Sequence, residues 1–177
     1  MNPNLAFLNP QHSEACHSSR RIREAFRPGD AAIRMDLSIR ADARRLFQVL
    51  TVPEYLEAWL CLPGHDGCSP AATRIHDDYL LEHSCGDAPA VLITGTYLVC
   101  RRRYVMFSWR VDGDLCVPES SVEIRLQGDF ERTTLSLEHS GFVSSEAWLW
   151  HKALWNASMT RLMRLYDAPD SLDSASL

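Results

Sequence analysis

The chain has 177 residues, a formal net charge of −5 and an apolar fraction of 46%, which suits one globular domain with its own core. The negative charge argues against general affinity for nucleic acid, and no apolar run approaches the ~18 residues that span a bilayer. All but one of the eighteen basic residues are Arg, and they do not gather on one predicted element. We therefore expect no nucleic-acid partner and no membrane insertion.

The two ends of the chain differ from its middle. Residues 1–30 hold two Asn-Pro pairs and scattered Ser and His, and they end at the breaker Pro28-Gly29. We predict a mobile N-terminal arm over 1–30, one domain over 31–168 and a disordered tail over 169–177. The N-terminus has no basic stretch followed by an apolar one, so we expect a cytoplasmic protein whose six cysteines are reduced.

The domain opens with a strand and two short helices. Residues 32–40 alternate apolar and polar side chains, which predicts a half-buried strand. Residues 41–50 then change to helical spacing. Thr51 and Glu54 match a capping box, in which each side chain bonds the backbone of the other residue, and a second short helix follows over 53–60.

Six strands follow a Gly- and Pro-rich loop. The predicted strands are residues 72–76, 78–85, 91–101, 104–112, 120–126 and 132–139. Short turn-like connections, such as Gly113-Asp114 and Gly128-Asp129, imply antiparallel pairing between successive strands.

The last predicted element is a long helix over 144–167. Its apolar side chains recur at steps of three and four, with one imidazole among them: Trp148, His151, Trp155, Met159, Leu162 and Tyr166. This helix is the only long cover available for the sheet. We predict an α+β fold in which a seven-stranded curved antiparallel sheet wraps around the C-terminal helix, in β-α-α-β6-α order.

Three stretches resemble a known family. They are TVPEYLEAWL, with Pro53, Glu54 and Trp59; TTLSLEHSGF, with His139 and Gly141; and HKALWNASMTRL, with His151, Trp155, Met159 and Leu162. Their order and spacing resemble the helix-grip fold of the START-like superfamily, also called SRPBCC. Within it they resemble the family named after the activator of heat-shock protein 90 ATPase. The likeness covers about Ala31 to Asp167 and implies a cavity between sheet and helix.

We expect a ligand site in that cavity. Its predicted lining consists of Phe107, Trp109, Trp148, Trp155 and Met159, since aromatic rings and a flexible thioether suit an adaptable apolar site. His139 and His151 should face the same space, as polar anchors or as an acid–base pair. Periodicity does not separate this cavity from a filled core made of the same residues.

Three functions are compatible with this pattern. The favoured one is binding of a small or medium hydrophobic molecule, whether lipid-like, polyketide-like or aromatic. An enzyme of the cyclase or dehydratase kind would use the same cavity, but no nucleophile elbow or H-E-x-x-H motif is found, and we assign no catalytic residue. The family name adds a chaperone-ATPase partner as a third.

Two other clusters carry weaker hypotheses. Cys61, His65 and Cys68 could hold zinc, but a fourth ligand is missing from the pattern. The run Arg101 to Arg103 could grip an anion, although a solvated cluster is expected at a hairpin turn. We therefore expect neither a metal nor a cofactor. A homodimer through an exposed strand or the N-terminal arm is compatible with the sequence.

Overall fold

The computed structural model describes residues 31–60, 62, 71–84, 89–112 and 119–167. The predicted N-terminal arm, the predicted tail and the candidate zinc residues Cys61, His65 and Cys68 lie outside this part of the chain. Within it, no helix is long and apolar enough to cross a membrane. The same part contains no group of three His, Cys, Asp or Glu side chains placed to hold a metal ion.

The elements follow the predicted order. They are β1 (Ile33–Ile39), α2 (Ala43–Thr51), α3 (Pro53–Trp59), β2 (Ala71–Ile75), β3 (Asp78–His83), β4 (Val91–Arg101), β5 (Tyr104–Val111), β6 (Ser120–Gly128), β7 (Thr133–Ser140) and α4 (Ser145–Asp167). This confirms the α+β class and the β-α-α-β6-α order.

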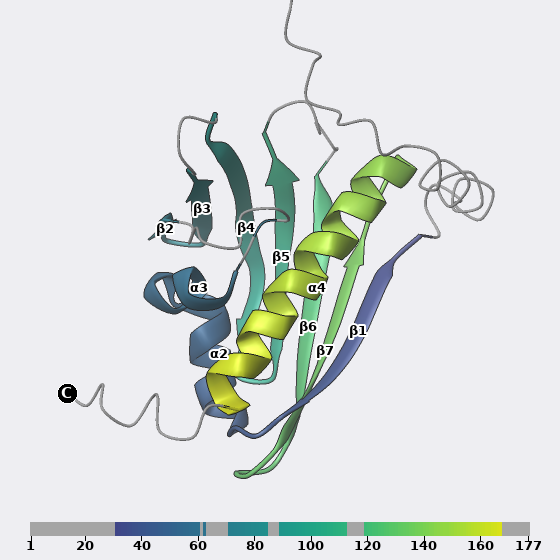
Figure 1. The fold of residues 1–177 in the computed structure, drawn as a ribbon. Coiled ribbons are helices and arrows are strands. Elements are labelled where there is room, and N and C mark those ends of the chain that lie inside the picture. The colour runs from purple at the N-terminus through teal and green to yellow at the C-terminus, as the bar shows by residue number, and fades with distance from the viewer. Residues whose placement is uncertain (1–30, 61, 63–70, 85–88, 113–118, 168–177) are drawn as a thin grey trace, which may run out of the picture.

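The strands form one antiparallel sheet in the order β1-β7-β6-β5-β4-β3-β2. Figure 1 shows α4 lying across one face of this sheet, with α2 and α3 beside it near β2 to β4. A single helix covers only part of so wide a sheet, and the two short helices extend the cover. The arrangement confirms the predicted helix-grip fold.

The alternation of side chains determines which face of the sheet is covered. On β5, the side chains of Val105, Phe107, Trp109 and Val111 are all buried, as their shared parity predicts. On α4, the fully buried positions include Trp155 and Leu162 of the predicted stripe, together with Leu154 and Ser158.

The predicted capping box between the two short helices is wrong. Thr51 is the last residue of α2, and its hydroxyl donates to the Phe47 carbonyl at 2.8 Å. Val52 is the N-cap of α3 and makes no side-chain cap, while its own N–H closes α2 on the Gln48 carbonyl. One residue therefore joins the two helices. Pro53 begins α3 without an N–H that needs a partner.

The ladder between β4 and β5 opens around Gly95. The Tyr79 hydroxyl, from β3, donates to the Ser108 carbonyl at 2.6 Å, and the Thr96 N–H donates to the Ser108 hydroxyl at 3.0 Å. Gly95 and Thr96 have no register partner on β5. A Cβ on Gly95 would overlap the Ser108 carbonyl oxygen and lie 2.5 Å from the Tyr79 hydroxyl. Only glycine admits the tyrosine here.

A Gly95→Ala substitution should therefore destabilise the domain by about 3 kcal/mol, because the added methyl displaces Tyr79 or the β5 backbone. Urea unfolding followed by circular dichroism measures the change. Thr94→Ala, one residue earlier on the same strand, is the matched control and should cost at most about 1 kcal/mol. Equal effects of the two substitutions would show that the close approach at Gly95 carries no special weight.

Candidate functional site: an aromatic cavity between the sheet, α3 and α4

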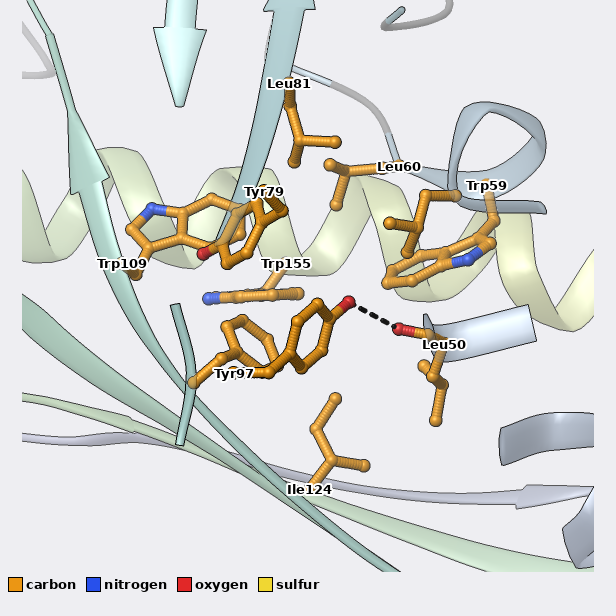
Figure 2. Close-up of a pocket in the computed structure, with 11 residues that line it drawn as sticks. Leu50, Trp59, Leu60, Tyr79, Leu81, Tyr97, Trp109, Ile124 and Trp155 are labelled. Atoms are coloured by element: carbon orange, nitrogen blue, oxygen red, sulfur yellow. Dashed lines mark hydrogen bonds between the residues drawn. The ribbon is translucent and has the colours of Figure 1, made fainter. Parts of the chain in front are cut away.

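A small cavity lies where the sheet, α3 and α4 meet. Eleven residues line it: Leu50, Leu56, Trp59, Leu60, Tyr79, Leu81, Tyr97, Phe107, Trp109, Ile124 and Trp155. Its volume is about 20 Å³, which is room for roughly one water-sized sphere. Figure 2 shows Trp155 in the middle of the group, with side chains from the sheet and from the α2–α3 segment around it.

Aromatic rings make up more than half of the lining. Tyr79 lies with its ring centroid 5.5 Å from that of Tyr97 and 5.8 Å from that of Phe107. The rings of Trp109 and Trp155 form a further tilted pair, with their centroids 5.3 Å apart. Tilted and edge-to-face pairs of this kind are the favoured geometry for aromatic rings, so the wall is a stable cluster.

The polar atoms of the lining already have partners. The Tyr97 hydroxyl donates to the Leu50 carbonyl at 3.3 Å, as Figure 2 shows, and the Trp59 indole donates to the Val49 carbonyl at 2.9 Å. Burial raises the pKa of Tyr97 to about 12 and raises the pKa of Tyr79 well above its ordinary value. Neither phenol exchanges a proton near neutral pH.

Arg74 supports the cavity wall from outside. Its guanidinium carbon lies 4.2 Å from the centre of the Tyr97 ring, a cation–π contact. The same side chain donates to the Thr51 carbonyl at 3.1 Å and to the His76 carbonyl at 2.9 Å. Arg74 thus ties β2 and its turn to the end of α2, behind one of the lining rings.

The seven predicted site residues fall into three groups. Phe107, Trp109 and Trp155 line the cavity. His139, His151 and Met159 are buried in the contact between α4 and the sheet but do not line it. Trp148 is half-buried and carries the Lys152 ammonium 4.7 Å from its ring centre. Contact of any of the seven with a ligand stays a prediction.

Sequence reasoning missed the part of the lining that comes from the first half of the domain. Tyr79 and Leu81 are two of the three buried positions of β3, and Trp59 and Leu60 lie at the end of α3. The alternation of β3 was a usable signal for the first pair. No local pattern brings α3 and β3 to the same cavity, because that depends on the tertiary fold.

The two histidines belong to a closed hydrogen-bond network next to the cavity. The Trp155 indole N–H donates to His139 Nδ1 at 2.8 Å. Because an indole only donates, Nδ1 carries no proton, and the Nε2–H of His139 donates to the Ser120 hydroxyl at 2.8 Å. Ser120 then donates to the Trp109 carbonyl at 2.9 Å.

His151 has the opposite tautomer. It accepts the Trp109 indole N–H on Nε2 at 3.1 Å, so its proton lies on Nδ1 and is donated to the Ala147 carbonyl at 2.7 Å. Burial, and secondly His151, hold the pKa of His139 well below its ordinary value. Burial lowers the pKa of His151 to about 4. Both rings are neutral at neutral pH, and each ring nitrogen has a hydrogen-bond partner.

Acid should therefore weaken the fold. His151 has a folded-state pKa of about 4, below its unfolded value of about 6.5, so its contribution is complete above pH 6.5 and declines as the pH falls to about 4. The free energy of unfolding should fall by up to about 1.4 kcal/mol per pH unit in this window, and His139 should steepen the slope further. Urea unfolding at a series of pH values measures it.

His151→Gln is the matched control. A Gln amide has an acceptor for the Trp109 N–H and a donor for the Ala147 carbonyl, but it does not titrate. The variant should lose about 1.4 kcal/mol per pH unit of the acid slope. An unchanged slope would mean that His151 is protonated without cost in the folded protein.

Comparison with known proteins identifies a family that matches this chain. The family model described as "Activator of Hsp90 ATPase homolog 1-like protein" matches residues 40–167. No curated protein gives a significant match to the chain.

Three solved structures illustrate the likeness in fold. CV1439 from Chromobacterium violaceum has a TM-score of 0.66 at 18% identity, covering 78% of this chain and 99% of that one. A protein from Arthrobacter aurescens has a TM-score of 0.65 at 11% identity, covering 82% and 92%. CalU16 from Micromonospora echinospora has a TM-score of 0.54 at 20% identity, covering 77% and 76%. At these identities the likeness concerns the fold alone. The family match, on a helix-grip fold, shows that the chain belongs to the Activator of Hsp90 ATPase homolog 1-like family.

Proposed function

We propose that the protein binds a small or medium hydrophobic molecule between α4, α3 and the sheet. The observation that carries the proposal is the cavity with an aliphatic and aromatic lining where the sheet, α3 and α4 meet. Large apolar surfaces with few polar groups are typical of ligand pockets. Every lining residue is aliphatic or aromatic, so the cavity offers no charged group to a ligand.

A ligand must enlarge the cavity, because about 20 Å³ is much less than the ~150 Å³ that holds a benzene ring. Tyr79, Tyr97 and Trp155 each make a hydrogen bond that fixes their position. Leu56 and Leu60 have no such bond to lose. We infer that the α3 side of the cavity moves, while the sheet side keeps its shape and presents its rings to the ligand.

The lining also bears on the class of ligand. Six of its eleven residues are aromatic, which favours a ligand with rings over a single flexible acyl chain. Among the lipid-like, polyketide-like and aromatic classes, the last two therefore receive more support. The phenolic oxygens of Tyr79 and Tyr97 donate to backbone carbonyls and keep the capacity to accept a hydrogen bond from a ligand.

The alternative functions receive less support. A cyclase or dehydratase needs a group in the cavity that transfers protons near neutral pH. Among the described lining residues the only titratable groups are the two phenols with raised pKa values. A chaperone-ATPase partner rests on the family name, and no feature of the described surface adds to it.

A cavity-filling variant tests the binding proposal. Leu81→Phe adds volume at a buried lining position and should occupy the space that the ligand needs. Trp155→Ala is a poorer test, because it also removes a core ring and the bond to His139. Naphthalene or indole at about 100 times the dissociation constant should stabilise the wild type by about 2.7 kcal/mol. Thermal unfolding measures the shift, which Leu81→Phe should abolish.

Leu98→Phe makes the same substitution at a position that is 55% exposed, and it should keep the full shift. Circular dichroism confirms that both variants fold. Native mass spectrometry of the purified protein then identifies any hydrophobic molecule that it carries. If Leu81→Phe folds and still shows the wild-type shift, the ligand binds elsewhere and the proposed site is wrong.

A further inference from the structure

We propose that one end of the molecule, formed by the β4–β5 turn, the β6–β7 turn and the start of α2, docks on the surface of an anionic phospholipid bilayer. This inference does not depend on the proposed ligand. It rests on arginines that are dispersed in the sequence and gather in space. We call this part of the molecule the basic end; its arginines are Arg40, Arg44, Arg45, Arg101 to Arg103 and Arg132, all of them exposed.

Hydrogen bonds hold the segments of the basic end together. Arg103, in the β4–β5 turn, donates to the Gly128 carbonyl at the end of β6 at 3.4 Å. Arg132, after the β6–β7 turn, donates to the Ser38 hydroxyl on β1 at 3.0 Å. The Thr133 hydroxyl, at the start of β7, donates to the Ala41 carbonyl just before α2 at 2.7 Å. Figure 1 shows both turns and the start of α2 at the lower end of the molecule.

The charge of the basic end is positive although the chain has a net charge of −5. Three carboxylates lie among its seven arginines. Asp42 accepts the Arg44 backbone N–H, and Asp129 accepts the backbone N–H groups of Glu131 and Arg132 at 3.0 Å. Glu131 is exposed. The arginines remain in excess, and guanidinium groups match the geometry of phosphate oxygens.

An exposed aromatic ring at the same end favours a bilayer over other anionic partners. Phe130 is 88% exposed in the β6–β7 turn, the largest exposed fraction among the large apolar side chains of the described residues. Figure 1 shows this turn projecting beyond α2 and α4. Proteins that bind single strands place their rings in a groove. A ring on a projecting turn beside arginines instead suits insertion between lipid headgroups.

Vesicle co-sedimentation of the full chain tests the proposal. The probes are vesicles of phosphatidylcholine alone and of phosphatidylcholine with an equal part of phosphatidylglycerol. We expect binding to the second kind at about 0.1 M salt, and a loss of at least tenfold at about 1 M salt, where the screening length is about 3 Å. Equal binding to both kinds of vesicle, or no binding to either, would overturn the proposal.

Paired substitutions locate the surface. One Arg near an anionic bilayer contributes about fivefold to partition, so R101Q/R102Q should bind about 25-fold more weakly. R40Q/R44Q, on a different segment of the basic end, should lose a similar factor. R34Q/R110Q removes the same charge from arginines that form exposed ion pairs with Glu138 and Asp112, outside the basic end, and should stay within about twofold of the wild type.

Further measurements distinguish bilayer docking at the basic end from a general charge effect and from nucleic-acid binding. Phe130→Ser should weaken binding to the anionic vesicles about tenfold while the protein stays folded, since the ring makes no buried contact. If R34Q/R110Q weakened vesicle binding as much as R101Q/R102Q, the effect would be one of general charge, and the basic end would not be the docking surface. Binding to DNA oligonucleotides without binding to vesicles would assign this end to nucleic acid and overturn the bilayer proposal.

Discussion

Two hydrogen bonds between tryptophan and histidine hold α4 on the sheet, and the rest of the structure depends on them. Trp155 on α4 donates to His139 on β7, and Trp109 on β5 donates to His151 on α4. In one bond the helix supplies the donor, and in the other the sheet supplies it. A helix that slid or rotated would lose both of them in a dry interior, where unpaired polar groups are costly. The position of α4, and with it of the cavity wall, is therefore fixed by specific partners as well as by apolar contact.

This network also occupies both ring nitrogens of each histidine. Each ring uses one nitrogen as an acceptor for an indole and the other as a donor, so that neither has a free position for a substrate. A proton added to His139 Nδ1 would face the Trp155 N–H, donor against donor. Buried polar networks of this kind are stable only when every member is satisfied, and here both nitrogens of His139 and of His151 have partners.

The strands and the long helix could be predicted because their side-chain periodicities are local. The alternation in β5 and β7 placed Phe107, Trp109 and His139 on the covered face, where they lie. The helical stripe likewise predicted burial of His151 and Trp155. Trp148 belongs to the same stripe but lies near its edge, where the sheet no longer covers it completely.

The cavity could be predicted only in part. The lining from α3 and β3 depends on how distant segments of the chain pack together, which no local pattern encodes. Tyr79 reaches Ser108 across β4 only because Gly95 leaves room, a relation among three strands that no window of sequence contains. The capping box failed for a similar reason. The Thr51 hydroxyl had a partner within α2, and a chain that passes directly from helix to helix left it no role as an N-cap. The gathering of arginines at one end follows from hairpin topology and was invisible in the order of residues.

The opening in the β4–β5 ladder has a consequence for how the sheet bends. At Gly95 and Thr96 the backbones of β4 and β5 have no register partners: the Ser108 hydroxyl joins Thr96 to β5, and the Tyr79 hydroxyl joins β3 to β5. Side-chain links tolerate changes in angle better than a continuous ladder, so a bend of the sheet between β4 and β5 at this point costs few backbone hydrogen bonds.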